Sequence, residues 1–305
     1  MNKTSTGSHY DTTAKGSYRT EVYDYLVRLR WHCSPHYHDK MDHVRVALLD
    51  TAQGLETVHA LRRGLKPENV YVANRDVRRG SAAAWKAVFT RSLKAAGYEN
   101  RCHVHPGEDL LGMCSRAGGP FDMINYDSCA TVGTAKWLCY VARLKSLVAV
   151  GGIFAVTVLA ARESQRVKRF MLESGDQHER DRIESASSFC DNRTGVIEGW
   201  HLARYRLIQA AVNAGRVNRI NVRDEPRCKV YVNAKSPMMS AAFKMSAWRG
   251  WDSTRPLAAL VGHLIDRNDD VTDEQLLTAV QSMQHDIDME RRAAAELMSG
   301  VLSHG

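Results

Sequence analysis

The feature that most constrains the fold is a strand–turn–helix–strand pattern in the first quarter of the chain. The apolar run Val44–Leu49 ends at Asp50, and a turn containing Gly54 leads into a helical pattern over residues 55–65. A second apolar run follows at residues 69–73. Such a unit places polar groups at the tips of neighbouring parallel strands, which predicts a nucleotide-type binding crevice at that edge of a sheet.

The alternation of strands and helices continues through the central part of the chain. We expect helices at residues 81–96, 134–147 and 200–214, strands at residues 102–105, 121–126 and 153–159, and further extended runs at residues 217–222, 228–232 and 238–245. A turn separates the last two runs, which predicts an antiparallel pair. The whole pattern predicts an α/β fold with a Rossmann-like, doubly wound, mostly parallel sheet and an antiparallel edge hairpin.

Composition shifts divide the chain into segments. These are a flexible polar tail at residues 1–17, a helical N-terminal extension with a His-rich loop at residues 18–41, the α/β domain at residues 42–246 with a charged insertion at residues 162–199, and a C-terminal extension at residues 247–305. The last contains a capping box, Thr272–Gln275, before a long helix with nearly heptad apolar spacing. We expect that helix either to dock on its own domain or to form a homo-oligomer contact.

Composition describes an ordinary globular protein with a basic balance. The 305 residues are 44% hydrophobic and 25% charged, and the net charge of +8 favours an acidic partner, of which nucleic acid is the commonest. The seven cysteines form no Cys-x-x-Cys pair, which favours free thiols in a reducing compartment. No apolar run reaches membrane-helix length and no signal core is present, so we expect a cytoplasmic protein without membrane contact.

Basic side chains gather around the expected crevice. They are Arg62, Arg63, Arg75, Arg78 and Arg79, joined later in the chain by Arg216, Arg219 and Arg223. Such side chains can contact phosphates, and they are equally typical of solvated helix ends. Nucleic acid is therefore a candidate partner and a plain basic surface is the alternative.

The order of these elements resembles the class I S-adenosylmethionine-dependent methyltransferase fold, over roughly residues 42–246. Within it, Lys66–Asn69 and Ala73–Asp76 are similar to segments of a methyltransferase-like group found on plasmids and viruses. The resemblance implies S-adenosylmethionine as the cofactor and methyl transfer as the activity. Catalysis would then consist mainly of orienting the acceptor against an already activated sulfonium.

The resemblance places most of the cofactor at the tips of the first two strands. Asp50 and Gly54 match the acid and the glycine turn that approach the methionine moiety, although the family's run of two or three glycines is reduced to one here. Asn74 stands where the family has an acid that accepts from both ribose hydroxyls, and Asp76 follows two residues later. An amide offers one acceptor oxygen where a carboxylate offers two.

The ends of the third and fourth strands complete the site that the resemblance implies. Glu108 aligns with an acid that meets the adenine amino group, while the neighbouring Asp109 suits a helix N-cap. Asp127 matches the polar position beside the transferred methyl group, where it would orient the acceptor or act as a base. Ser128 and Cys129 replace the prolines found in enzymes that methylate base amines, which puts that substrate in question.

Other functions stay open at this point. The same fold with an eroded cofactor turn would serve as a nucleic-acid-binding or assembly protein, and the single glycine and Asn74 favour that alternative. A nicotinamide enzyme ranks lower because the dinucleotide glycine fingerprint is absent. A zinc site at Cys33, His36 and His38 lacks a fourth ligand, so we expect an exposed loop and no bound metal.

Overall fold

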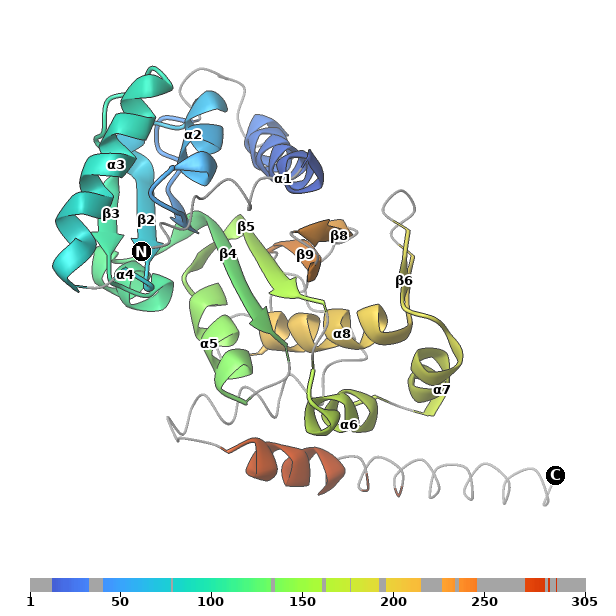
Figure 1. Cartoon of the computed structure of the whole chain (residues 1–305). Helices are drawn as coiled ribbons and strands as arrows, with labels where there is room; N and C mark the ends of the chain where they lie inside the picture. Colours follow the sequence, from blue (N-terminus) through green and yellow to red (C-terminus); the bar gives the residue numbers. More distant parts are fainter. Residues whose placement is uncertain are drawn as a thin grey trace, which may run out of the picture.

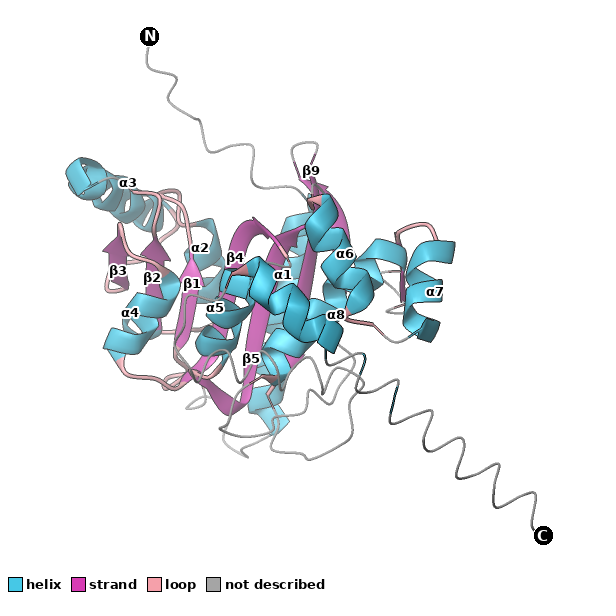
Figure 2. Cartoon of the chain, turned by 90° about the horizontal axis from the view of Figure 1, so that it is seen from below, coloured by secondary structure: helices cyan, strands magenta, loops and turns pink. Residues whose placement is uncertain are grey.

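The computed structural model describes residues 13–32, 41–77, 79–132, 135–160, 163–175, 177–191, 196–214, 227–233, 236–245 and 272–282, with residues 285 and 289. Among these residues, seven strands form one sheet in the order β3-β2-β1-β4-β5-β9-β8. The strands are β1 (Val46–Leu49), β2 (Val70–Asn74), β3 (His103–Pro106), β4 (Phe121–Thr131), β5 (Val148–Leu159), β8 (Arg227–Asn233) and β9 (Ser236–Lys244). Figures 1 and 2 show this order across the molecule.

The sheet has the mixed topology that the sequence predicts. The strands β1 to β5 pair in parallel, and β9 runs antiparallel to both β5 and β8. The hairpin turn between β8 and β9 falls where the antiparallel pair was expected. The α/β, Rossmann-like prediction is therefore confirmed, and the order of elements is the one that the methyltransferase resemblance implies.

Helices cover both faces of this sheet (Figure 2). The helices that precede β8 in the sequence are α1 (Thr13–His32), α2 (Leu55–Arg62), α3 (Ala82–Ala95), α4 (Leu110–Ala117), α5 (Ala135–Lys145), α6 (Gln165–Glu173), α7 (Gln177–Ser185) and α8 (Gly199–Asn213), with short 3₁₀ turns at Pro67–Asn69 and Arg79–Ser81. Of these, α6 and α7 pack on α8 rather than on the sheet. None of the described helices is both long and apolar enough to cross a membrane.

Alternation along the strands builds two hydrophobic cores, one on each face. Val46 and Leu48 of β1 belong to a core with α1, α2 and α3, whereas Ala47 between them belongs to a core with α4, α5 and α8. Met123 and Ile124 of β4 divide in the same way. The sheet therefore carries α1, α2 and α3 on one side, and this side also carries the polar groups described below.

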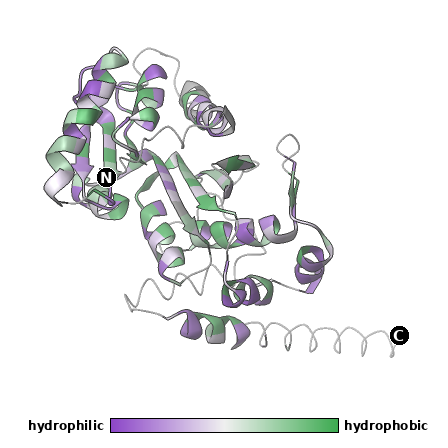
Figure 3. Ribbon diagram, in the orientation of Figure 1, coloured by the Kyte–Doolittle hydropathy of each residue, from purple (hydrophilic) through white to green (hydrophobic). Residues whose placement is uncertain are grey.

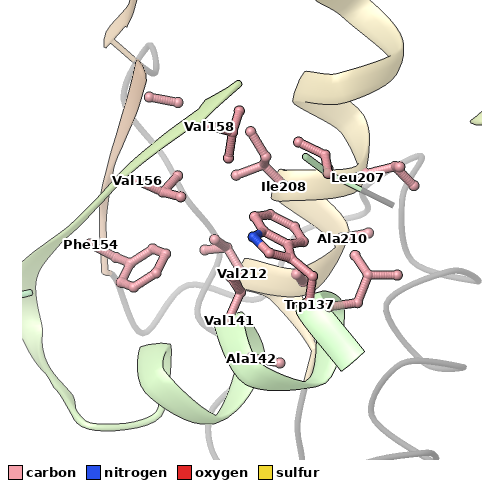
Figure 4. Close-up of a cluster of buried hydrophobic side chains, with 14 of the residues drawn as sticks. Trp137, Val141, Ala142, Phe154, Val156, Val158, Leu207, Ile208, Ala210 and Val212 are labelled. Carbon is pink, nitrogen blue, oxygen red and sulfur yellow. The ribbon is translucent and has the colours of Figure 1, made fainter. Parts of the chain in front are cut away.

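The larger core lies between β5 and the pair α5 and α8. Figure 4 shows Trp137 and Val141 of α5 beside Ile208 and Val212 of α8, with Val156 of β5 nearby. Each of these side chains is at most 6% exposed. Burial of one such side chain stabilises the fold by about 1.5–3 kcal/mol, so this layer holds α8 on the sheet.

Several elements extend beyond their predicted bounds. Helix α1 begins at Thr13 rather than Tyr18, so part of the expected tail is helical. Strand β4 runs to Thr131, which places Asp127 inside the strand and not after it. Strand β5 begins at Val148, and its pairing with β4 is irregular between Val148 and Ile153. Within that stretch, a Cβ atom at Gly152 would lie 2.7 Å from the Asp122 backbone oxygen of β4.

The charged insertion folds into regular elements. It contains α6 and α7 and a small hairpin of β6 (Phe189–Cys190) and β7 (Ile197–Glu198). Figure 3 shows how hydrophilic α6 and α7 are. A buried ion pair between Arg204 of α8 and Glu163, with Arg204 Nε to Glu163 Oε1 at 2.5 Å, joins the start of the insertion to α8.

The C-terminal helix starts as predicted. The Thr272 backbone N–H donates to Gln275 Oε1 at 2.8 Å, and the Gln275 N–H donates back to Thr272 Oγ1 at 3.2 Å, which confirms the capping box. Leu276 and Val280 are buried in the larger core, so this first part docks on its own domain. The positions of the predicted heptad seam from Met283 onward lie outside the described residues, and the oligomer contact stays a prediction.

Candidate functional site

Asp50 closes the turn between β1 and α2. Its carboxylate accepts hydrogen bonds from the Thr51 N–H, the Thr57 N–H and the Thr57 hydroxyl, each at 2.8 Å. Burial raises the pKa of Asp50, although the bonds from Thr57 and Thr51 oppose that change. Asp50 thus fixes where α2 begins, and most of its acceptor capacity is used within the chain.

Gly54 holds the same turn in a conformation that favours glycine. Its φ is +63°, and a Cβ atom there would lie 3.2 Å from the ring of Phe89 on α3. Both facts exclude a larger side chain without rearrangement. The glycine that the resemblance assigns to the cofactor turn is therefore also required by the packing of α3.

The tip of β2 borders a pocket of about 420 Å³. Asn74 donates from Nδ2 to the Asp50 carbonyl at 2.7 Å and accepts from the Asp76 N–H at 3.1 Å, so its amide serves the turn. The Asp76 side chain is 93% exposed. Both residues line the pocket together with Trp85 and Val88 of α3, which supply an aromatic and an apolar wall.

Glu108 and Asp109 follow β3 and have separate roles. Glu108 pairs with Arg116 of α4 and lies 3.3 Å from His105 Nδ1. Asp109 is the N-cap of α4, because its Oδ1 accepts from the Gly112 N–H at 2.9 Å. The N-cap expectation is confirmed, and no hydrogen bond or ion pair of the described residues links Glu108 to the other candidate residues.

Glu56 is a buried carboxylate in the first turn of α2. It pairs with Arg19 of α1, and Asn125 of β4 donates to its Oε2 at 3.3 Å. Burial raises the pKa of Glu56 to about 7, although the charge and the hydrogen bond of Arg19 lower it. Asp50 and Asp127 add to the increase, which shows that the three carboxylates lie within electrostatic reach of one another.

Asp127 lies on the same face of β4 as Asn125, two residues earlier. Its carboxylate pairs with the Lys15 ammonium of α1, and the two side chains are 11% and 8% exposed. Burial lowers the pKa of Lys15, but the charge and the hydrogen bond of Asp127 outweigh it, and the net change is an increase. Lys15 is therefore a fully charged ammonium held against Asp127.

The structure brings some of the predicted residues together and separates others. Asp50 and Asn74 are joined directly, and Asp50 and Asp127 both lie near Glu56. Asp76 lies at the pocket and Glu108 at the start of α4. The predicted roles of all these residues in binding or catalysis remain predictions.

Of the basic residues, some are described and others are not. Arg62 and Arg75 are exposed, and Arg63 pairs with Asp24 at 2.8 Å. Arg78 and residues 215–226 lie outside the described residues, as does the Cys33–His38 loop. Within the described part of the chain, no group of His, Cys, Asp and Glu side chains is placed to hold a metal ion.

Sequence reasoning missed Lys15, Arg19 and Glu56. The first two were assigned to a tail and to an unremarkable amphipathic helix, although their spacing of four places them on one helical face. Tyr18, Val22, Tyr23 and Leu26 give that helix a continuous buried side. The sequence did contain one signal for these residues, namely two cations beside an apolar stripe. Cations that are buried together with such a stripe need carboxylate partners, which would have pointed to acidic residues under the helix.

Comparison with known proteins gives fold-level likeness only. No protein-family model matches the sequence, and a search of curated proteins finds no relative. An O-methyltransferase from Bacillus cereus in complex with SAH is 14% identical, with 78% of this chain and 83% of that chain covered and a TM-score of 0.42. An N-methyltransferase from Bradyrhizobium japonicum is 12% identical, with 75% and 97% covered and a TM-score of 0.39.

An rRNA methylase from Streptococcus thermophilus is similar to the same degree. It is 13% identical, with 73% of this chain and 93% of that chain covered and a TM-score of 0.37. Because these TM-scores lie below 0.5, the likenesses carry no conclusion about function.

Proposed function

We propose that this protein is an S-adenosylmethionine-dependent methyltransferase-like protein. The adenosyl group would occupy the pocket at the tip of β2, and methyl transfer would take place beside Asp127. The observation that carries the proposal is the combination of that pocket with a buried cluster of charges on the same side of the sheet.

The pocket suits an adenosyl group. Its volume of about 420 Å³ falls in the usual range for small-molecule sites. Trp85 offers a ring for stacking, and the Asp76 carboxylate offers two acceptor oxygens for a diol. Since the Asn74 amide is engaged with the β1–α2 turn, Asp76 is the better candidate for the ribose.

The charge cluster suits a cationic ligand. Asp50 and Glu56 are buried and the Asp127 side chain is 11% exposed, and within the described part of the chain Lys15 pairs with Asp127 and Arg19 with Glu56. Burial and the charges of Asp50 and Asp127 raise the pKa of Glu56 to about 7, so a third negative charge is disfavoured in this cluster. The sulfonium of S-adenosylmethionine would add a positive charge that favours the ionised carboxylates, along with the activated methyl group.

One alternative has its own support. The oxygens of Asp50 already accept three hydrogen bonds, and the side chains of Lys15 and Arg19 lie against the carboxylates of the cluster. These features favour an eroded fold that serves in nucleic-acid binding or assembly.

Calorimetric titration with S-adenosylmethionine distinguishes the two. We expect saturable heat from the wild-type protein and weaker binding by Trp85→Ala, because the aromatic wall of the pocket is lost. Thr90→Ala, on the exposed face of the same helix α3, is the matched control and should bind like the wild type. Absence of heat at high micromolar ligand would favour the eroded alternative.

A nucleic-acid partner is a separate proposal that rests on the net charge of +8. Phosphate contacts release counterions, so an affinity for oligonucleotides should fall steeply as salt increases. An affinity for oligonucleotides that does not change with salt would contradict the nucleic-acid proposal and would leave the methyltransferase proposal unaffected.

A further inference from the structure

Helix α1 lies across the polar end of the candidate site and sends two cations into it. It contacts α2 on one side and β5 and β8 on the other, and Figure 1 shows it beside α2. Lys15 and Arg19 are on the face that meets the sheet, at 7% exposure each. The position that Asp127 offers to an acceptor nitrogen is thus taken by a nitrogen of the chain itself, Lys15 Nζ.

The surroundings of Lys15 contain more hydrogen-bonding groups than the described chain satisfies. Asn125 is 5% exposed, and its Oδ1 has no hydrogen-bond partner among the described residues. The Tyr18 hydroxyl, in a residue that is 3% exposed, is likewise without a partner there, and the charges of Glu56 and Asp127 lie near it. Buried groups of this kind normally have partners, so they offer unused hydrogen-bonding capacity beside Lys15 to a polar ligand.

The charges favour one kind of ligand over another. The amine of a nucleobase is neutral and flat, and the aromatic and proline platform that would hold it is replaced by Ser128 and Cys129. A primary aliphatic amine is an ammonium with three donors, which matches the carboxylates of Asp127 and Glu56 and the free acceptor of Asn125. Lys15 is itself such a group, and the chain already holds it at Asp127.

We propose that the subsite beside Asp127 binds a primary aliphatic ammonium, and that Lys15 is its internal occupant until an acceptor amine replaces it. The identification of this ligand as the acceptor rests on the proposed function. The amine is either a free alkylamine or the side chain of a lysine in another polypeptide.

Methyl transfer to such an amine balances with the groups present. The ammonium first gives a proton to the Asp127 carboxylate. The nitrogen lone pair then forms the N–C bond while the S–C bond of the sulfonium breaks, which leaves a thioether and a methylated ammonium. Asp127 finally returns its proton to solvent. Catalysis would thus require Asp127 to alternate between its two protonation states.

The first test measures binding and needs no catalysis. Lys15→Ala should remove the Lys15 ammonium from beside Asp127, so n-butylammonium, an analogue of the lysine side chain, should raise the melting temperature of this variant. We expect its affinity for the variant to exceed that for the wild type by about tenfold or more, since pairing a buried carboxylate contributes at least 1.4 kcal/mol. Lys15→Ala/Asp127→Asn should lose the response.

A matched control comes from another ion pair of α1, at the contact with β8. Lys229 of β8 pairs with Glu21, and Lys229→Ala loosens the helix without opening the Asp127 subsite. This variant should respond to n-butylammonium no more than the wild type. If Lys15→Ala is unfolded alone, recovery of its circular dichroism on addition of n-butylammonium is the same positive result. Equal responses of Lys15→Ala and wild type, a response that survives Asp127→Asn, or no recovery would overturn the proposal.

The second test identifies the acceptor by mass spectrometry. Lys15→Ala and S-adenosylmethionine are incubated with n-butylamine, with a lysine-containing peptide or with an oligonucleotide. A methyl group on either amine supports the inference and tells the two sources apart. A methyl group on the oligonucleotide alone overturns the inference while the proposed function stands. Absence of S-adenosylmethionine binding defeats the proposed function, and the n-butylammonium response then still decides whether the subsite exists.

Discussion

The raised pKa of Glu56 predicts a specific dependence of stability on pH. Its pKa moves from 4.5 to about 7 in the folded protein, because burial disfavours the ionised carboxyl more than Arg19 favours it. The folded state therefore holds the Glu56 proton more tightly than the unfolded state. That contribution to stability is fully present below pH 4.5 and is lost as the pH rises through 7.

The size of this stability change follows from the thermodynamic linkage between proton binding and folding. The change in pKa corresponds to about 3 kcal/mol of unfolding free energy between pH 4.5 and pH 8. Glu56→Gln keeps the shape of the side chain but removes the titration. The unfolding free energy of the variant minus that of the wild type should therefore increase by about 3 kcal/mol across this range.

Urea unfolding at a series of pH values, followed by circular dichroism, measures that difference. The comparison must be between variants because His59, whose pKa is lowered to about 4 by burial and nearby arginines, contributes the opposite slope between pH 4 and 6.5. His59→Gln is thus a control that should give a difference of opposite sign. If the unfolding free energies of Glu56→Gln and the wild type depend on pH in the same way, the account of the charge cluster is refuted.

Three further substitutions test the frame around the site, each by urea unfolding. Gly54→Ala should destabilise by about 1–3 kcal/mol because of its positive φ and the Phe89 ring, and an unchanged midpoint would contradict that packing. Asp109→Ala should lower the unfolding free energy by about 1 kcal/mol, because the N-cap bond from the Gly112 N–H is lost, whereas Asp109→Asn should retain most of that stability. Ile208→Ala should cost about 2–5 kcal/mol, and a cost below 1 kcal/mol would show that α8 is not held by this layer.

The sequence was sufficient to predict the order of strands and helices in the sheet, because local patterns determine these elements. The apolar strand runs, the helical spacing and the turn between β8 and β9 all agree, and tertiary packing followed them. The end of β4 was not predictable in this way. Its segment from Asp127 to Thr131 is polar and small, and it is held as a strand by pairing with β5, which no local pattern indicates.

The candidate site was harder to predict because its members come from distant parts of the chain. Asp50 and Asn74 lie at the ends of apolar runs, so their place at strand tips could be predicted, whereas Asp127 lies inside β4. The roles of Lys15 and Glu56 could not be predicted. Lys15 pairs with Asp127 and Glu56 pairs with Arg19, and a single sequence does not reveal pairs of residues that lie so far apart in the chain. Asn74 shows a second difficulty, since its amide holds the β1–α2 turn, a role that the sequence did not indicate.

The contact between α1 and β8 has a consequence for the order in which the chain matures during translation. The ammonium of Lys229 bonds to Glu21 and lies 3.1 Å from the Ser17 hydroxyl, so the first helix rests on one of the last strands of the sheet. Ribosomes deliver residues in sequence, so α1 can pack on α2 and β1 early but completes its contacts only after residues 227–244 emerge. Among the described elements, the first in the sequence thus depends on two of the later strands to complete its packing.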